Sequence, residues 1–275
     1  MKTGHSFRMT AGAAFLLAAM AAVSAAAAPQ LPARAPRQGG VYVIAHRGAH
    51  NGIPENTIPA YAKAIELGAD FVEVDLRPTK DGHIVSVHNS TVDAYTQDAK
   101  GNVSDFTLDE LKAMDIGSRV GLGWADTRIP TLEEIIALCR GKIGLYVDLK
   151  AADVEAVVAQ LRAAGMAGDA VWYAGAGQLR KLRETCPECQ PMPDPGHEKG
   201  LPRLLDMLQP KVVASSMKNL TPAMVKACHD AGALLFVDDT GPGDWAQMLA
   251  WGVDGIQTDE PEALIALLKA RDAQK

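Results

Sequence analysis

The sequence predicts an α/β protein built as a single TIM-type (β/α)8 barrel. Apolar, β-branched segments alternate with amphipathic helical segments from about residue 41 to residue 272. The 275-residue chain is long enough for one such barrel, and two small domains are the less favoured division. Acidic, basic and histidine residues repeatedly end the predicted strands, which is where barrel enzymes place their chemistry.

Strands are expected wherever β-branched, aromatic or alternating apolar residues form a short run. These runs lie at 41–45, 71–76, 83–88, 143–149, 170–174, 189–192, 211–214, 233–238 and 254–257. Helical patterns lie at 56–67, 108–114, 153–164, 177–185, 199–208, 221–230, 243–251 and 261–270. Another helix is expected to begin at Thr131, since Glu134 follows three residues later as in a capping box.

Two stretches depart from strict alternation. Only a turn, Thr79–Gly82, separates the strands at 71–76 and 83–88, so the second is either the arm of a hairpin or a regular barrel strand. Residues 90–129 are rich in Asp, Gly, Thr and Ser around one helical piece. They are expected to form an inserted loop and helix segment over the barrel mouth.

The first 28 residues are predicted to be a secretory signal peptide. Lys2 and Arg8 precede a short apolar run, and Ala26–Ala28 offer small residues for cleavage. The run is too short to span a bilayer comfortably, so an uncleaved anchor is the less favoured alternative. Residues 29–40 are expected to be a flexible leader and 41–272 the barrel domain. An exported protein, periplasmic or extracellular, without stable membrane insertion after cleavage, is the expectation.

The charge of the chain argues against two kinds of partner. The formal net charge is −6 and becomes −8 once Lys2 and Arg8 are removed. A chain of this charge is not expected to bind nucleic acid or an anionic bilayer through its overall field. A phosphate-bearing substrate would be held by a few local cations, and the sequence leaves the oligomeric state open.

The cysteines favour a local disulfide over a metal or redox site. Cys186 and Cys189 have zinc-knuckle or redox spacing, but no second pair completes a zinc site. A redox motif would need its own strand and helix at the start of a domain. In an exported chain a disulfide between the two is the favoured interpretation. Cys139, on a predicted helix, is expected to be buried and inert.

Glu73 and Asp75 point to a metal site. They alternate with apolar residues in one predicted strand, so both project from the same face. Two adjacent carboxylates repel each other unless a cation lies between them. Oxygen ligands without a nearby cysteine favour Ca²⁺ or Mg²⁺ over zinc. The alternative is that these acids only pair with buried Arg or Lys side chains.

Several motifs together resemble the glycerophosphodiester phosphodiesterase family, within the phosphatidylinositol phospholipase C-like superfamily. The resemblance covers residues 41–270, and the order and spacing of the motifs are more specific than any one of them. The matching positions are His46-Arg47-Gly48, Pro54-Glu55-Asn56-Thr57, Glu73-x-Asp75, Asp81-Gly82 through His88-Asn89, Asp148-x-Lys150 and Gly252 through Pro261.

The resemblance implies a set of site roles. His46 and His88 would be an acid–base pair, suited by an imidazole that titrates near neutrality. Arg47 and Lys150 would bind the substrate phosphate. Glu73, Asp75 and Asp148 would hold one divalent cation, Ca²⁺ or Mg²⁺. In that family the histidines are thought to help a hydroxyl of the substrate's glycerol attack phosphorus, giving a cyclic phosphate that water opens.

Three departures from the family pattern concern the site. Asp148 replaces the usual Glu, and Asn89 replaces the Asp after the second histidine, so any charge of that Asp on His88 is lost. Phe236–Asp239 replaces a W-T-x-N motif, which leaves head-group preference open. Trp124 or Trp172 is expected either to line the pocket or to serve as core or cover.

One further position is ambiguous. Glu55 and Asn56 are expected to orient the loop after the first strand. Asn56 is equally well explained as the N-cap of the following helix.

These expectations give one preferred function and two alternatives. The preferred function is an exported, metal-dependent phosphodiesterase that hydrolyses small-molecule glycerophosphodiesters to glycerol 3-phosphate and an alcohol. The first alternative is a phospholipase D-like enzyme acting on lysophospholipid or sphingomyelin head groups. The second is a non-catalytic barrel that binds a phosphorylated ligand.

Overall fold

A computed structural model describes Met1 and residues 34–274, so the predicted signal peptide after Met1 and the first five residues of the predicted leader, 29–33, lie outside the described residues. Eight parallel strands follow the order β6-β5-β4-β2-β1-β9-β8-β7. One hydrogen bond, from the Ala214 amide to the Pro193 carbonyl (3.0 Å), joins the β6 and β7 ends of this order. The predicted (β/α)8 barrel is confirmed. Its strands are β1 (Tyr42–Ala45), β2 (Phe71–Pro78), β4 (Gly144–Asp148), β5 (Ala170–Tyr173), β6 (Gln190–Pro191), β7 (Val212–Ser216), β8 (Leu234–Asp238) and β9 (Gly255–Thr258).

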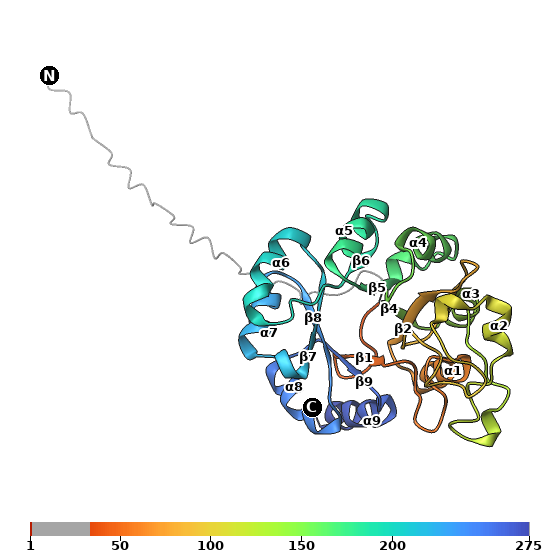
Figure 1. Cartoon of the computed structure of the whole chain (residues 1–275). Coiled ribbons are helices and arrows are strands. Elements are labelled where there is room, and N and C mark those ends of the chain that lie inside the picture. Colours follow the sequence, from red (N-terminus) through yellow and green to blue (C-terminus); the bar gives the residue numbers. More distant parts are fainter. Residues whose placement is uncertain (2–33, 275) are drawn as a thin grey trace.

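Helices surround this barrel on its outside (Figure 1). Thr57 caps the first of them, because its hydroxyl accepts from the Ala60 amide (3.4 Å). The interpretation of Asn56 as the N-cap is therefore wrong. The expected capping box of Thr131 and Glu134 is present at α3. The helices are α1 (Ile58–Leu67), α2 (Leu108–Ala113), α3 (Leu132–Cys139), α4 (Val154–Ala163), α5 (Ala176–Thr185), α6 (Leu201–Leu208), α7 (Pro222–Asp230), α8 (Trp245–Trp251) and α9 (Pro261–Asp272).

The segment after β2 forms a hairpin outside the barrel. β3 (Ile84–Ser86) pairs antiparallel with the end of β2, with Leu76 opposite Ser86. This resolves the open alternative in favour of a hairpin arm. The insertion at 90–129 contains α2 and shares a small apolar core with β3. The Trp124 indole N–H donates to the Gly52 carbonyl (2.9 Å), which ties the insertion to the β1–α1 loop.

Three aromatic rings fill the amino-terminal end of the barrel. Tyr42, Phe71 and Phe236 lie with ring centroids 5.3–5.9 Å apart. Gly144 and Gly255 make room for them, because a Cβ at either position would lie 2.5 Å from an aromatic carbon. This aromatic floor leaves only the carboxyl ends of the strands for a polar site.

Two of the four cysteines form a disulfide, and another is buried. Cys186 and Cys189 form a disulfide, as expected. Cys139 is buried, and burial raises the pKa of its thiol to about 12, which agrees with an inert core cysteine. Among the described helices, none has the length and apolarity required to cross a bilayer.

Candidate active site

Three buried carboxylates meet at the carboxyl ends of β2 and β4. Glu73 and Asp75 are the third and fifth residues of β2, so both face the barrel interior. Asp148 is the last residue of β4 and pairs in register with Asp75. One oxygen of each residue lies within 4.8 Å of the others. We call Glu73, Asp75 and Asp148 the carboxylate trio, and the structure brings together all three residues that the sequence indicated.

The positive charge around the trio does not fully compensate its three carboxylates. Burial, and then the charges of Asp75 and Asp148, raise the pKa of Glu73 well above its usual range. Burial also raises the pKa of Asp148, although Lys150 partly opposes this. For Asp75 burial again raises the pKa, but the Lys150 ammonium and the Asn56 amide outweigh it and the net shift is downward. The arrangement therefore favours an additional bound cation.

The two expected phosphate-binding residues lie at the trio. Lys150 Nζ is 2.6 Å from an oxygen of Asp148 and 3.2 Å from one of Asp75. Arg47 Nε lies 3.9 Å from Asp75, and its Nη1 donates to Glu55 Oε1 (3.1 Å). These ion pairs are also those that the alternative interpretation expects, in which the acids only pair with Arg or Lys side chains. Because both side chains are only partly buried, each can also face an incoming phosphate.

Asn56 orients Asp75 from behind. Its amide Nδ2 donates to Asp75 Oδ2 (2.7 Å). Its Oδ1 accepts from the hydroxyls of Tyr61 (2.8 Å) and Ser86 (2.9 Å), which fixes the amide orientation. Tyr61 and Ser86 are fully or almost fully buried, and the sequence analysis did not single them out.

The loop after β1 holds two residues in the left-handed region. Arg47 and Asn56 each have φ of 54°. Such angles are uncommon for residues other than glycine and cost of order 1–3 kcal/mol. The loop keeps them through two hydrogen bonds: the Arg47 amide donates to Glu73 Oε2 (2.8 Å), and the Asn56 amide donates to the Arg47 carbonyl (2.9 Å). The Arg47 backbone amide in this loop therefore helps to fix the position of the Glu73 carboxylate.

The two predicted catalytic histidines are each oriented through Nδ1. His46 follows β1, and its Nδ1 lies 2.7 Å from Asp259 Oδ1. His88 follows β3, and its Nδ1 lies 3.0 Å from Asn89 Oδ1. Arg77 holds the His88 carbonyl through Nη2 (2.6 Å). In both rings Nε2 is thus the nitrogen left to face a substrate.

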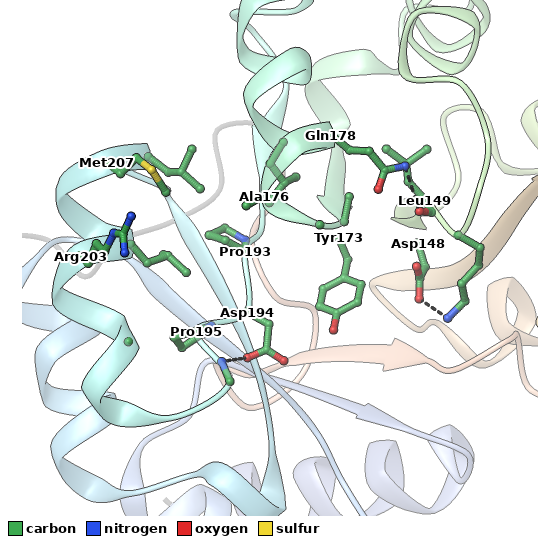
Figure 2. Close-up of a pocket in the computed structure, with 18 residues that line it drawn as sticks. Asp148, Leu149, Tyr173, Ala176, Gln178, Pro193, Asp194, Pro195, Arg203 and Met207 are labelled. Atoms are coloured by element: carbon green, nitrogen blue, oxygen red, sulfur yellow. Dashed lines mark hydrogen bonds and ion pairs between the residues drawn. The ribbon is translucent and has the colours of Figure 1, made fainter.

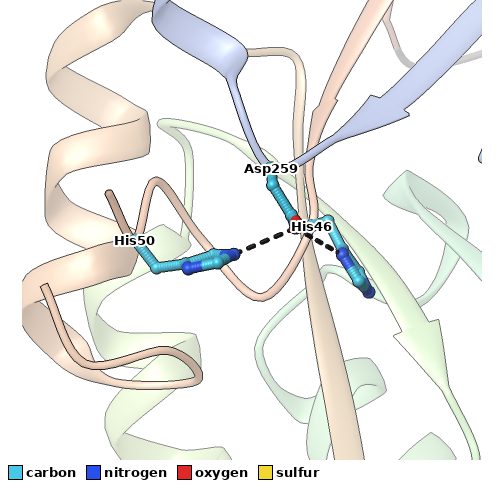
Figure 3. A group of neighbouring side chains, drawn as sticks. All are labelled: His46, His50 and Asp259. Atoms are coloured by element: carbon cyan, nitrogen blue, oxygen red, sulfur yellow. Dashed lines mark hydrogen bonds and ion pairs between the residues drawn. The ribbon is translucent and has the colours of Figure 1, made fainter. Parts of the chain in front are cut away.

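The sequence analysis did not identify Asp259, which contacts His46, or His50, which contacts Asp259. Asp259 follows β9, which pairs with β1, so its carboxylate reaches His46 across adjacent strand ends. His50 Nε2 lies 3.0 Å from the same carboxylate oxygen (Figure 3). The position of Asp259 within the family-like ending, directly after a predicted strand, was the available signal.

A cavity of about 640 Å³ opens beside the trio. Asp148 lies at one end, and the walls come from α5 and α6 (Figure 2). Lys150, which also lines the cavity, is paired with Asp148. Leu179, Leu204 and Met207 make much of this wall apolar. Trp172 does not line the cavity, since it is fully buried in β5, and Trp124 covers the β1–α1 loop instead. The cavity is large enough for one arm of a small diester.

Clustered carboxylates, an arginine, a lysine and a histidine at the carboxyl ends of the barrel strands, with a second histidine on the adjoining hairpin, are the groups that a phosphodiester hydrolase needs. The model of the glycerophosphoryl diester phosphodiesterase family matches residues 46–166. A glycerophosphodiester phosphodiesterase from Caldanaerobacter subterraneus subsp. tengcongensis is 36% identical over 248 residues, covering 82% of this chain and 97% of that protein. The chain therefore belongs to the glycerophosphodiester phosphodiesterase family.

Solved structures agree with this assignment. A glycerophosphodiester phosphodiesterase from Agrobacterium tumefaciens superposes with a TM-score of 0.75 at 26% identity, over 82% of this chain and 99% of that one. A phosphodiesterase from Oleispira antarctica, solved with the product sn-glycerol-3-phosphate, shares the fold with a TM-score of 0.75 at 22% identity, over 85% and 97%. The expected enzyme class, a phosphoric diester hydrolase with a small glycerophosphodiester substrate, is confirmed by the family membership. This favours an enzyme over the non-catalytic barrel.

Proposed function

We propose that the protein is an exported, metal-dependent glycerophosphodiester phosphodiesterase that releases glycerol 3-phosphate and an alcohol. The observation that carries the proposal is the carboxylate trio, whose oxygens lie within 4.8 Å of one another beside Lys150 and Arg47. The proposal of export is supported by the signal-peptide pattern of residues 1–28. We assign the barrel domain to residues 41–272.

The trio fits a hard divalent cation, Ca²⁺ or Mg²⁺. Its donors are all carboxylate oxygens, and the three carboxylates are buried close enough for their negative charges to repel one another. Asp148, although shorter than Glu, reaches the other two members. When bound, such an ion would neutralise charge on the phosphoryl oxygens. Arg47 would hold a phosphate oxygen by its forked guanidinium, and Lys150 would add a point charge.

The histidines would carry the protons of the reaction. Asp259 and the Asn89 carbonyl hold Nδ1 of His46 and His88, which leaves Nε2 of one ring to take the proton of the attacking glycerol hydroxyl. Nε2 of the other ring would protonate the leaving alkoxide as the phosphorus–oxygen bond breaks. Water would then open the resulting cyclic phosphate while the two rings exchange roles.

One observation bears on the phospholipase D-like alternative. The cavity beside Asp148 carries an apolar wall, including Leu179, Leu204 and Met207, which would suit the acyl chain of a lysophospholipid. Arg203 and Gln178 in the same cavity would equally suit a polar head group. The cavity therefore accepts either class, and substrate turnover must decide.

The test is an assay of the purified protein on glycerophosphocholine, glycerophosphoethanolamine and lysophosphatidylcholine. Each reaction is run with chelator, and then with Ca²⁺ or Mg²⁺ restored. The proposal expects turnover of the first two substrates, abolished by chelator and recovered with either ion. Turnover of the lysolipid alone would support the alternative, and full activity in chelator would remove the metal from the mechanism.

A further inference from the structure

A second group of metal-ligating side chains lies at the barrel mouth and shares no residue with the carboxylate trio. His46 and His50 direct their rings at the same Asp259 oxygen from either side (Figure 3). The distances to Asp259 Oδ1 are 2.7 Å from His46 Nδ1 and 3.0 Å from His50 Nε2. Both imidazole nitrogens thus lie within hydrogen-bonding distance of one carboxylate oxygen.

We propose that His46, His50 and Asp259 bind a borderline divalent metal such as Zn²⁺, and that metal bound there inhibits the hydrolysis. Two nitrogens and one oxygen are a donor set that suits zinc, whereas Ca²⁺ and Mg²⁺ prefer oxygen alone. The side chains are 20%, 22% and 61% exposed, so a metal can reach them and water can complete its shell. We call these three residues the imidazole site.

The geometry is close to what zinc requires. The three ligand atoms lie within 4.8 Å of one another. Bonds of about 2.0–2.2 Å in a tetrahedral site place ligand atoms roughly 3.4 Å apart. The nitrogen–oxygen distances must therefore widen by about 0.7 Å for His46 and about 0.4 Å for His50, which the exposed Asp259 side chain can allow by rotating.

Inhibition follows from the two nitrogens of one ring. With Nδ1–H donated to Asp259, Nε2 of His46 is free to accept a proton. A metal on Nδ1 leaves the ring proton on Nε2, so His46 can no longer act as a base. This step rests on the proposed function, whereas metal binding itself does not.

Calorimetric titration of the purified protein with zinc chloride, in excess Mg²⁺ to occupy the trio, tests the binding. The wild type is expected to bind one zinc ion. His50→Ala and His50→Asn are expected to bind zinc at least about tenfold more weakly, which is the smaller loss of metal affinity seen when a residue that only supports a ligand is replaced. His229→Ala is the matched control. His229 Nε2 lies 2.9 Å from an Asp254 oxygen, a similar contact, but among the described residues His229 belongs to no group that could hold a metal ion. Equal zinc affinity in the wild type and both His50 variants would overturn the site.

Inhibition is measured separately, with each variant normalised to its own zinc-free rate. Zinc should inhibit the wild type near its binding constant, and both His50 variants should need at least about tenfold more zinc. Relief of inhibition by added Mg²⁺ would place zinc at the trio and overturn the inhibitory role. If the protein hydrolyses none of the glycerophosphodiesters, the proposed function fails while the calorimetry still decides whether the imidazole site exists.

Discussion

Replacing Glu73 by Gln tests whether the trio is electrostatically strained without a cation. Glu73 is fully buried, and burial together with Asp75 and Asp148 raises its pKa well above 4.5. A carboxyl with a raised folded pKa contributes stability that is fully present below its unfolded pKa and is lost as pH rises toward the folded value. Within that window one titrating proton changes the free energy of unfolding by about 1.4 kcal/mol per pH unit.

The Gln side chain has nearly the same shape and does not titrate. In chelator, the free energy of unfolding of Glu73→Gln should therefore fall less steeply than that of the wild type as the pH rises above the usual glutamate pKa, by up to about 1.4 kcal/mol per unit. Urea denaturation at several pH values measures both slopes. Glu66→Gln, at an exposed glutamate paired with Lys63, is the control and should keep the wild-type slope. Parallel curves for Glu73→Gln and the wild type would refute the reasoning.

Three other predictions concern the histidines and the barrel floor. His46→Ala and His88→Ala should each lower kcat by about a hundredfold or more, as loss of general acid–base catalysis does, and near-normal turnover would remove that residue from the mechanism. Asp259→Asn should lower kcat at least about tenfold with KM little changed, because the amide no longer fixes the His46 ring by charge; a rise in KM with kcat unchanged, measured by steady-state kinetics, would contradict this role. Gly144→Ala should cost about 1–3 kcal/mol of unfolding free energy, since its Cβ would lie 2.5 Å from the Phe71 ring, and an unchanged urea midpoint would contradict that packing.

The parts of the fold that the sequence predicted are those that depend on local periodicity. Alternation along β2 placed Glu73 and Asp75 on one face, and the acidic residue ending β4 completed the trio once the strands paired in register. The barrel followed from the same reasoning, because alternating strands and helices form few other architectures. Even the short β6, only Gln190–Pro191, lies within the strand expected at 189–192, although its pairing with β5 depends on its neighbours.

What the sequence could not predict depends on contacts distant along the chain or on unusual backbone angles. Asp259 lies 213 positions from His46, and only the pairing of β9 with β1 brings them together. The left-handed conformation of Arg47 is set by hydrogen bonds within the folded loop, so residue type gave no signal for it, whereas Asn56 is of a type that adopts this region more readily. Asn56 was equally well explained as a helix cap.

The central claim, one divalent cation held by the carboxylate trio, is tested most directly by a crystal structure of the protein soaked with Mn²⁺, an oxygen-preferring ion with an anomalous signal. We expect a single strong anomalous peak within about 2.6 Å of one oxygen each from Glu73, Asp75 and Asp148. A structure with no peak there, or with Asp148 outside the shell of the ion, would contradict the account.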